Sequence, residues 1–247
     1  ALICSISLFF VVILCGCSNS KQTVSENNGT AFVAKDIDPT QLGKAQKSST
    51  PASSSAQNSA LTQAKDALAK DPKDVKARIK AAIILDTQGD ASAAEDMLRD
   101  GLKLGIKNAE LYHTVGMFYM KHHVKTASIE ALFAETQLEP KNALAHSKLA
   151  EALGYMGKSD ESMIEYKRAI ELDPKLPDPY LGMAYLYNTP ENHNKAIEYI
   201  KKYIATSPNK GPGYGLLSRV YLNMHQYDEA IKAGENAVKE KSDEPNL

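Results

Sequence analysis

The chain has 247 residues and a nearly balanced charge, with 29 Lys and Arg against 30 Asp and Glu. Acidic and basic residues are mixed along it, as is typical of solvated helix faces. The sequence therefore lacks both the basic stripe that binds nucleic acid and a basic patch that would bind a membrane surface.

The chain begins with an almost wholly apolar segment, Ala1 to Leu14, which is followed by Cys15-Gly16-Cys17. This segment is too short to span a bilayer as a mature helix. It fits the apolar core of a signal peptide that precedes small residues. The segment has no initial Met and no basic leader, so we expect a longer precursor.

Leu14-Cys15-Gly16-Cys17 resembles the lipobox of bacterial lipoproteins. The resemblance implies a signal peptide over residues 1–16 and a mature N-terminal Cys17 that carries acyl chains, palmitate among them, in the lipid bilayer. Two or three acyl chains anchor far more firmly than one, at about 0.8 kcal/mol per buried CH₂. Cleavage leaves Cys17 without a disulfide partner. Two alternatives stay open: a secreted protein cut nearby, and a cytosolic protein with an apolar leader.

Residues 17–58 predict a disordered tether behind the lipidated cysteine. They are rich in Ser, Thr, Asn, Gln and Lys, with an almost unbroken small polar run from Ser48 to Ser55. Such a segment cannot bury enough apolar surface to offset the entropy of ordering. A flexible tether of about 40 residues has an end-to-end distance near 35 Å.

A 34-residue period begins after the tether. Two series of small residues keep this spacing without an insertion: Ala94, Ser128, Ser162, Ala196 and Ala230, and Ala82, Gly116, Ala150, Ala184 and Ser218. A fixed period of this length marks an array of stacked supersecondary units. Apolar residues between the small ones recur at i and i+4, as on amphipathic helices, and Pro140, Pro174 and Pro208 end each second helix.

The stretch Tyr112 to Tyr119 resembles the first helix of a tetratricopeptide repeat, and Tyr227 to Ile231 resembles the start of its second helix. The resemblance implies an all-α protein, an α-solenoid with the form of a right-handed superhelix. It covers a lone second helix near 59–72 and five repeats within a domain of residues 59–247: 75–108, 109–142, 143–176, 177–210 and 211–244. Arg78 and His146 depart from the family because they replace its usual aromatic residue.

Few residues suggest chemistry, and we predict that the chain is not an enzyme. His122 and His123 could bind a metal, but no carboxylate or cysteine is placed to complete a ligand set, so we interpret them as a solvated turn. The Asp and Glu pairs recur with the repeat and fit the first turns of helices. A Gly-x-Ser-x-Gly elbow and a glycine-rich phosphate loop are absent from the sequence. We expect no cofactor, no metal and no small-molecule substrate.

The predicted site is a surface rather than a catalytic group. In the family, first helices line a concave groove, and an exposed apolar surface rimmed by charge suggests a binding site. The groove-facing phases here are Ile79, Ile83, Glu110, His113, Met117, Met120, Lys148, Glu151, Tyr155, Leu181, Tyr185, Leu216 and Arg219. The family's clamp for C-terminal carboxylates needs paired Lys and Asn, but Ile79, Ile83 and Thr114 stand at those phases. Binding of that kind is therefore not expected.

These features predict a membrane-anchored scaffold of the bacterial cell envelope that binds a partner peptide or helix in its groove, as an assembly or secretion accessory. The alternative is a regulatory or auxiliary subunit of an envelope enzyme, such as a peptidoglycan-processing complex. Ser18 after Cys17 resembles the outer-membrane sorting case. We therefore expect the outer membrane, facing the periplasm, in a Gram-negative cell, and the outer face of the cytoplasmic membrane otherwise.

Overall fold

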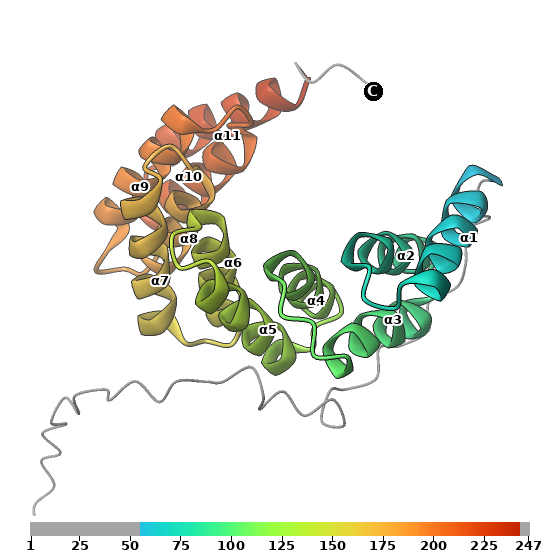
Figure 1. Ribbon diagram of the computed structural model, residues 1–247. Helices are drawn as coiled ribbons and strands as arrows, with labels where there is room; N and C mark the ends of the chain where they lie inside the picture. Colours follow the sequence, from blue (N-terminus) through green and yellow to red (C-terminus); the bar gives the residue numbers. More distant parts are fainter. Residues whose placement is uncertain (1–54, 243–247) are drawn as a thin grey trace, which may run out of the picture. The chain divides into compact units, whose positions relative to one another are not determined.

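The computed structural model describes residues 55–242, which fall within one structural unit. This part of the chain forms eleven α-helices and no strand (Figure 1). The helices are α1 Ser55–Lys70, α2 Val75–Thr87, α3 Ala91–Lys103, α4 Ala109–Lys121, α5 Lys125–Leu138, α6 Ala143–Tyr155, α7 Ser159–Leu172, α8 Asp178–Leu186, α9 His193–Thr206, α10 Gly211–Asn223 and α11 Tyr227–Ser242. The predicted leader, Cys17 and residues 18–54 of the predicted tether lie outside the described residues. Residues 55–58, which were assigned to the tether, instead form the first turn of α1.

Consecutive helices pack against one another in chain order. The helix α1 stands alone before five pairs, which are α2 with α3, α4 with α5, α6 with α7, α8 with α9, and α10 with α11. The prediction of an α-solenoid with about five helix pairs and an additional half repeat is therefore confirmed. None of the described helices is both long and apolar enough to cross a membrane.

The small residues that carry the period lie where the helices of one pair cross. Ala94, Ala150, Ala184 and Ala196 are fully buried. Gly116 of α4 shows how little room there is, because a Cβ placed on it would lie 2.5 Å from Cγ of Leu132, itself fully buried on α5. Gly215 of α10 differs, since a Cβ there would have no neighbour within 4 Å.

This contrast predicts stability changes of opposite sign. Gly116→Ala should lower the free energy of unfolding by about 1–3 kcal/mol, because the interior cannot accept the extra methyl group. Gly215→Ala should raise it by about 0.5–1 kcal/mol, because Ala favours the helix over Gly and meets no obstacle. Urea unfolding followed by circular dichroism measures both. Changes of the same sign would contradict this account of the helix crossing.

The first helices begin at a repeated polar cap. Asp74, Asn108 and Asn142 are spaced by 34 residues and precede α2, α4 and α6. Each side-chain oxygen accepts a hydrogen bond from a backbone N–H in the following turn, at 3.0 Å from Ala77, Leu111 and Leu144 respectively. Such caps satisfy N–H groups that a helix leaves unpaired. The prolines act at the other end, since α5, α7 and α9 each end two residues before one.

Three different side chains make the same contact at the phase where the family carries an aromatic residue. Tyr180 donates its hydroxyl hydrogen to the carbonyl of Pro174, at 2.9 Å. His146 contacts the carbonyl of Pro140 through Nε2 at 3.1 Å, and Arg78 donates to that of Pro72 at 2.6 Å. Each carbonyl lies six residues before the side chain that contacts it. The two departures from the family pattern therefore preserve a hydrogen bond between the end of one repeat and the first helix of the next.

The junction between α3 and α4 packs less closely than the later junctions between pairs. Polar contacts join the first two pairs there, since Asp86 at the end of α2 accepts from Lys121 Nζ at 2.6 Å and from His122 Nε2 at 2.7 Å. Burial alone would raise the pKa of Asp86, but these hydrogen bonds outweigh it and hold the pKa below its usual value. His122 is thus half-buried and bonded, which corrects its interpretation as part of a solvated turn.

Candidate functional site

Two large aromatic side chains on the first helices are exposed. Tyr155 at the end of α6 is 62% exposed, and Tyr185 near the end of α8 is 50% exposed. Each stands beside a cavity, and Tyr155 lines two of them. We use the name α4–α8 surface for the residues that line these two cavities.

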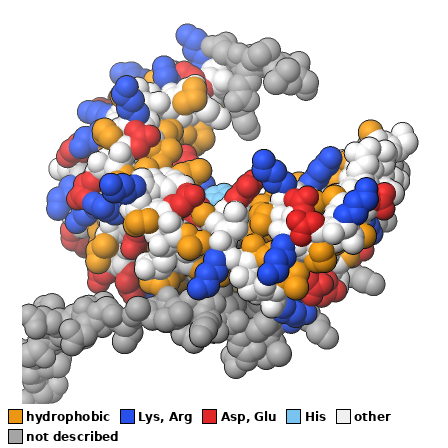
Figure 2. All heavy atoms as spheres, viewed as in Figure 1, with side chains coloured by type: hydrophobic (Ala, Val, Ile, Leu, Met, Phe, Trp, Pro, Cys, Tyr) orange, Lys and Arg blue, Asp and Glu red, His pale blue; other side chains and the backbone are white. Residues whose placement is uncertain are grey.

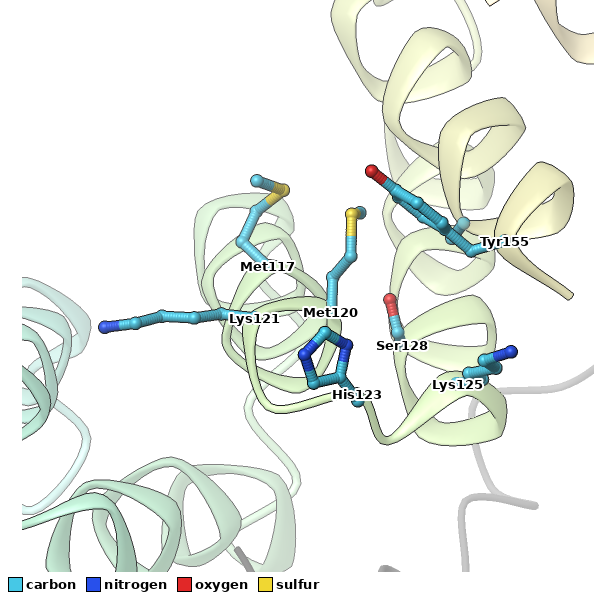
Figure 3. A pocket seen from close by; sticks show the side chains of 8 residues that line it. Met117, Met120, Lys121, His123, Lys125, Ser128 and Tyr155 are labelled. Carbon is cyan, nitrogen blue, oxygen red and sulfur yellow. The ribbon is translucent and has the colours of Figure 1, made fainter. Parts of the chain in front are cut away.

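The first cavity lies between α4, α5 and α6 and has a volume of about 320 Å³. Met117, Met120, Ala152 and Tyr155 form its apolar walls. Its other lining residues are Lys121, His123, Lys125 and Ser128, so three of them are basic and none is acidic. Figure 3 shows Met117, Met120 and the ring of Tyr155 around one open space, with the Ser128 hydroxyl directed toward it.

The second cavity lies between α6, α7 and α8 and has a volume of about 500 Å³. Tyr155 and Tyr185 line it together with Leu181 and Leu186. Its polar lining residues include Lys148, Glu151, Asp178 and Tyr166. Two carboxylates face one ammonium group here, so this cavity is locally acidic where the first is basic. The two cavities adjoin at Tyr155.

Lys148 holds the acidic groups of the second cavity together. Its Nζ lies 3.1 Å from Glu151 and 3.4 Å from Asp178, which joins α6 to α8. Burial alone would lower the pKa of Lys148, but the two carboxylates outweigh it and raise the pKa, so the side chain stays charged. Burial also raises the pKa of Tyr166, with Glu151 adding to the effect, so its phenol stays neutral.

Arg219 of α10 extends the surface toward the next pair. Its guanidinium lies 5.4 Å from the centroid of the Tyr185 ring, at the distance of a cation–π contact. Two further polar residues were predicted for the groove. Glu110 is exposed and lines neither cavity, whereas His113 is half-buried. Its Nδ1 lies 3.0 Å from the buried carboxylate of Glu135, so it joins α4 to α5.

The structure corrects two predicted groove residues. Ile79 is 8% exposed and Leu216 is 2% exposed, and each belongs to a buried apolar cluster. The cluster of Ile79 includes Leu61 of α1, and that of Leu216 includes Ile200 of α9. A neighbouring helix therefore covers each of them. Ile83 is exposed but lines neither cavity, and Leu181 is half-buried beside the second.

Several lining residues escaped the sequence reasoning. Lys125, Ser128 and Tyr166 belong to second helices, which the family assigns to the outer face, and yet they line the cavities. His123 lies in a turn with φ of 60°. The turn between the two helices of a pair could have indicated these residues. It brings the end of the first helix close to the start of the second, so residues of both can line one cavity. Within residues 55–242, no cluster of three or more His, Cys, Asp or Glu side chains could hold a metal ion.

Charges of both signs are mixed over the face shown in Figure 2, with hydrophobic side chains between them. This face has no large region of a single charge. What distinguishes it is confined to the α4–α8 surface. Exposed tyrosines adjoin cavities of moderate size whose polar groups differ in charge. Such an arrangement suits the binding of side chains from another protein.

The comparisons with known proteins agree with the fold. Residues 143–176, which contain α6 and α7, match the tetratricopeptide repeat family. No curated protein matches the sequence. Among solved structures, the chain is similar to MamA, with a TM-score of 0.57 and 25% identity over 65% of this chain and 94% of that one.

Two further solved structures resemble the chain. One is pilF of Pseudomonas aeruginosa, with a TM-score of 0.63 and 19% identity over 73% of this chain and 82% of that one. The other is YrrB, described as a TPR protein with an unusual peptide-binding site, with a TM-score of 0.55 and 23% identity over 64% and 81% of the two chains. At these identities the likeness shows the fold alone. The matches support the tetratricopeptide resemblance, and proteins of this repeat class serve as scaffolds for protein–protein interaction.

Proposed function

We propose that the chain is a lipid-anchored tetratricopeptide scaffold of a bacterial cell envelope, and that it holds a peptide or helix of a partner protein on the α4–α8 surface. The observation that carries the binding role is Tyr155, an exposed aromatic side chain between two cavities. Tyr155 is 62% exposed, although an exposed ring of this size loses favourable burial.

The envelope role has support from the sequence. Leu14-Cys15-Gly16-Cys17 provides the acylation signal, and Ser18 accords with sorting to an outer membrane. A polar tether then separates the anchor from the repeats. Binding is proposed rather than catalysis, because Lys121, Lys148, Glu151 and Asp178 beside the cavities are held in ion pairs, and the Ser128 hydroxyl is hydrogen-bonded to no base.

Photo-crosslinking in living cells tests the binding surface. A benzoyl-phenylalanine residue in place of Tyr155 should form covalent adducts with one partner, because the ring enters the interface. The same residue in place of Lys201, an exposed position on α9, should form none with that partner. Mass spectrometry of the adducts identifies the partner. Equal adduct formation at both positions, or none at Tyr155, would refute the α4–α8 surface as the binding site.

The alternative function, an auxiliary subunit of an envelope enzyme, has an observation of its own. The helix α11 exposes Tyr227, Ile231 and Val238, at 59%, 60% and 70%. Such a row of apolar side chains can contact a large partner outside the cavities. Adducts from benzoyl-phenylalanine at Ile231, with none at Tyr155, would favour this function.

A further inference from the structure

The hydroxyl of Ser128 is the starting observation. Ser128 is 1% exposed, its Oγ has no hydrogen-bond partner, and it lines the first cavity. Ser162 occupies the same phase one repeat later, and its hydroxyl donates to the carbonyl of Ala150 at 2.7 Å. The repeat thus offers a partner at this phase, which Ser128 does not use. Figure 3 shows the Ser128 hydroxyl pointing into the space between Met120 and Tyr155.

A buried hydroxyl without a partner is unfavourable, so a ligand atom that bonds to it gains more than one that meets an already satisfied group. Met117 and Met120 line the same cavity, so a change in their side chains can open access to the hydroxyl. Methionine is unbranched and changes rotamer readily. The hydroxyl can then donate to an acceptor at the end of an inserted side chain.

The charge around the cavity selects among acceptors. Lys125 is exposed and has no ion-pair partner among the described residues, whereas Lys121 is paired with Asp86. No carboxylate lines this cavity. A negatively charged acceptor therefore gains attraction to Lys125 and meets no repulsion. A positively charged side chain would be repelled by Lys125 in the first cavity, whereas the second cavity offers it the carboxylates of Glu151 and Asp178.

We propose that the first cavity receives an acidic side chain of the partner, flanked by an aliphatic residue. The aliphatic group and the methylene stem of the acid pack against Met117, Met120 and Tyr155, while the carboxylate accepts a hydrogen bond from Ser128 and faces Lys125. This assignment rests on the proposed function and adds the chemistry of the bound segment. Because the second cavity has the opposite charge, the segment binds in one direction, with its acidic end toward α4.

Defined peptides and methionine NMR test the assignment. The probes are acetyl-Ser-Leu-Glu-Leu-Ser-amide and its counterparts with Gln or Lys at the centre. The full chain, in detergent, carries ¹³C-labelled methyl groups on its 7 methionines. The signals of Met117 and Met120 are assigned through their Leu variants. The Glu peptide should shift these two signals and leave that of Met224 unchanged, and the Lys peptide should bind about tenfold more weakly.

Two variants locate the preference for acid. Lys125→Glu should reverse it, so that the Lys peptide binds more tightly than the Glu peptide. Ser128→Ala should weaken the Glu peptide more than the Lys peptide and leave the melting temperature unchanged or higher, since Ala occupies this phase in three other repeats. Ser162→Ala is the matched control, and it should lower the melting temperature because it removes a satisfied bond.

Equal affinity for the three peptides, an unchanged preference in Lys125→Glu, or the absence of any shift at Met117 and Met120 would each overturn the proposal. These outcomes separate it from the proposed function. Suppose that position 155 forms crosslinks but the three peptides bind equally well. The scaffold role would then stand, and only the acidic ligand would be refuted.

Discussion

Replacing both Tyr155 and Tyr185 by Ala is expected to abolish capture of the partner while the repeats stay folded. The two rings flank the second cavity, and exposed aromatic anchors of this kind dominate many interfaces, at about 2 kcal/mol or more for each truncation. Little stability should be lost, because both side chains are at least half exposed. The variant also loses the cation–π contact of Arg219 with Tyr185, which contributes about 0.5–1 kcal/mol at an exposed site.

The measurement is a pull-down from solubilised membranes, read by quantitative mass spectrometry and accompanied by thermal unfolding. Tyr227→Ala serves as the matched control, since Tyr227 is also an exposed tyrosine, at 59%, but lies on α11. It should retain the partner. Recovery of the same proteins by the double variant would exclude the α4–α8 surface. Loss of the partner in Tyr227→Ala alone would assign binding to α11.

Cys17→Ala should release the protein from the membrane fraction into the soluble fraction. The reason is the loss of the acyl chains, because each buried CH₂ contributes about 0.8 kcal/mol to anchoring. Cell fractionation and labelling with a radioactive fatty acid measure the effect. Cys15→Ala is the control, since it removes a neighbouring thiol within the predicted signal peptide and should still incorporate label. A Cys17→Ala protein that stays with membranes, beside a wild type without label, would disprove lipidation.

The helices could be predicted from the sequence because their determinants are periodic. A small residue at a fixed phase is required where two helices cross, and Gly116 and Ala184 meet that requirement in different repeats. Prolines at the same interval end the second helices. The polar caps Asp74, Asn108 and Asn142 carried an equal signal that the sequence reasoning missed. The sequence also does not show that Arg78 and His146 can replace the usual aromatic residue. That becomes clear only from the hydrogen bonds that both side chains make with a backbone carbonyl.

The site was less predictable because it depends on how successive pairs tilt. A helical phase states which side of a helix a residue occupies, but it does not state whether the next pair covers that side. Ile79 and Tyr155 were assigned to one surface, and the first is buried while the second is exposed. The unused hydroxyl of Ser128 is invisible to pattern reasoning, since Ser162 has the same phase and is fully bonded.

The weakly packed junction between α3 and α4 has a mechanical consequence. An anchor at Cys17 would transmit any pull on the protein through α1, α2 and α3 before it reaches the α4–α8 surface. The first two pairs share an apolar cluster, and the ionic contact at Asp86 joins them as well. Dissolved salt weakens that ionic contact more than it weakens apolar packing. Acid acts in the same direction. The pKa of Asp86 is lower in the folded state than in the unfolded state, so ionised Asp86 stabilises the fold at pH values above the unfolded-state pKa. This stability is lost as the pH falls through the folded-state pKa. If the chain is anchored at Cys17, we therefore expect tension, salt and acid to strain the junction between α3 and α4 before they strain the more closely packed later junctions.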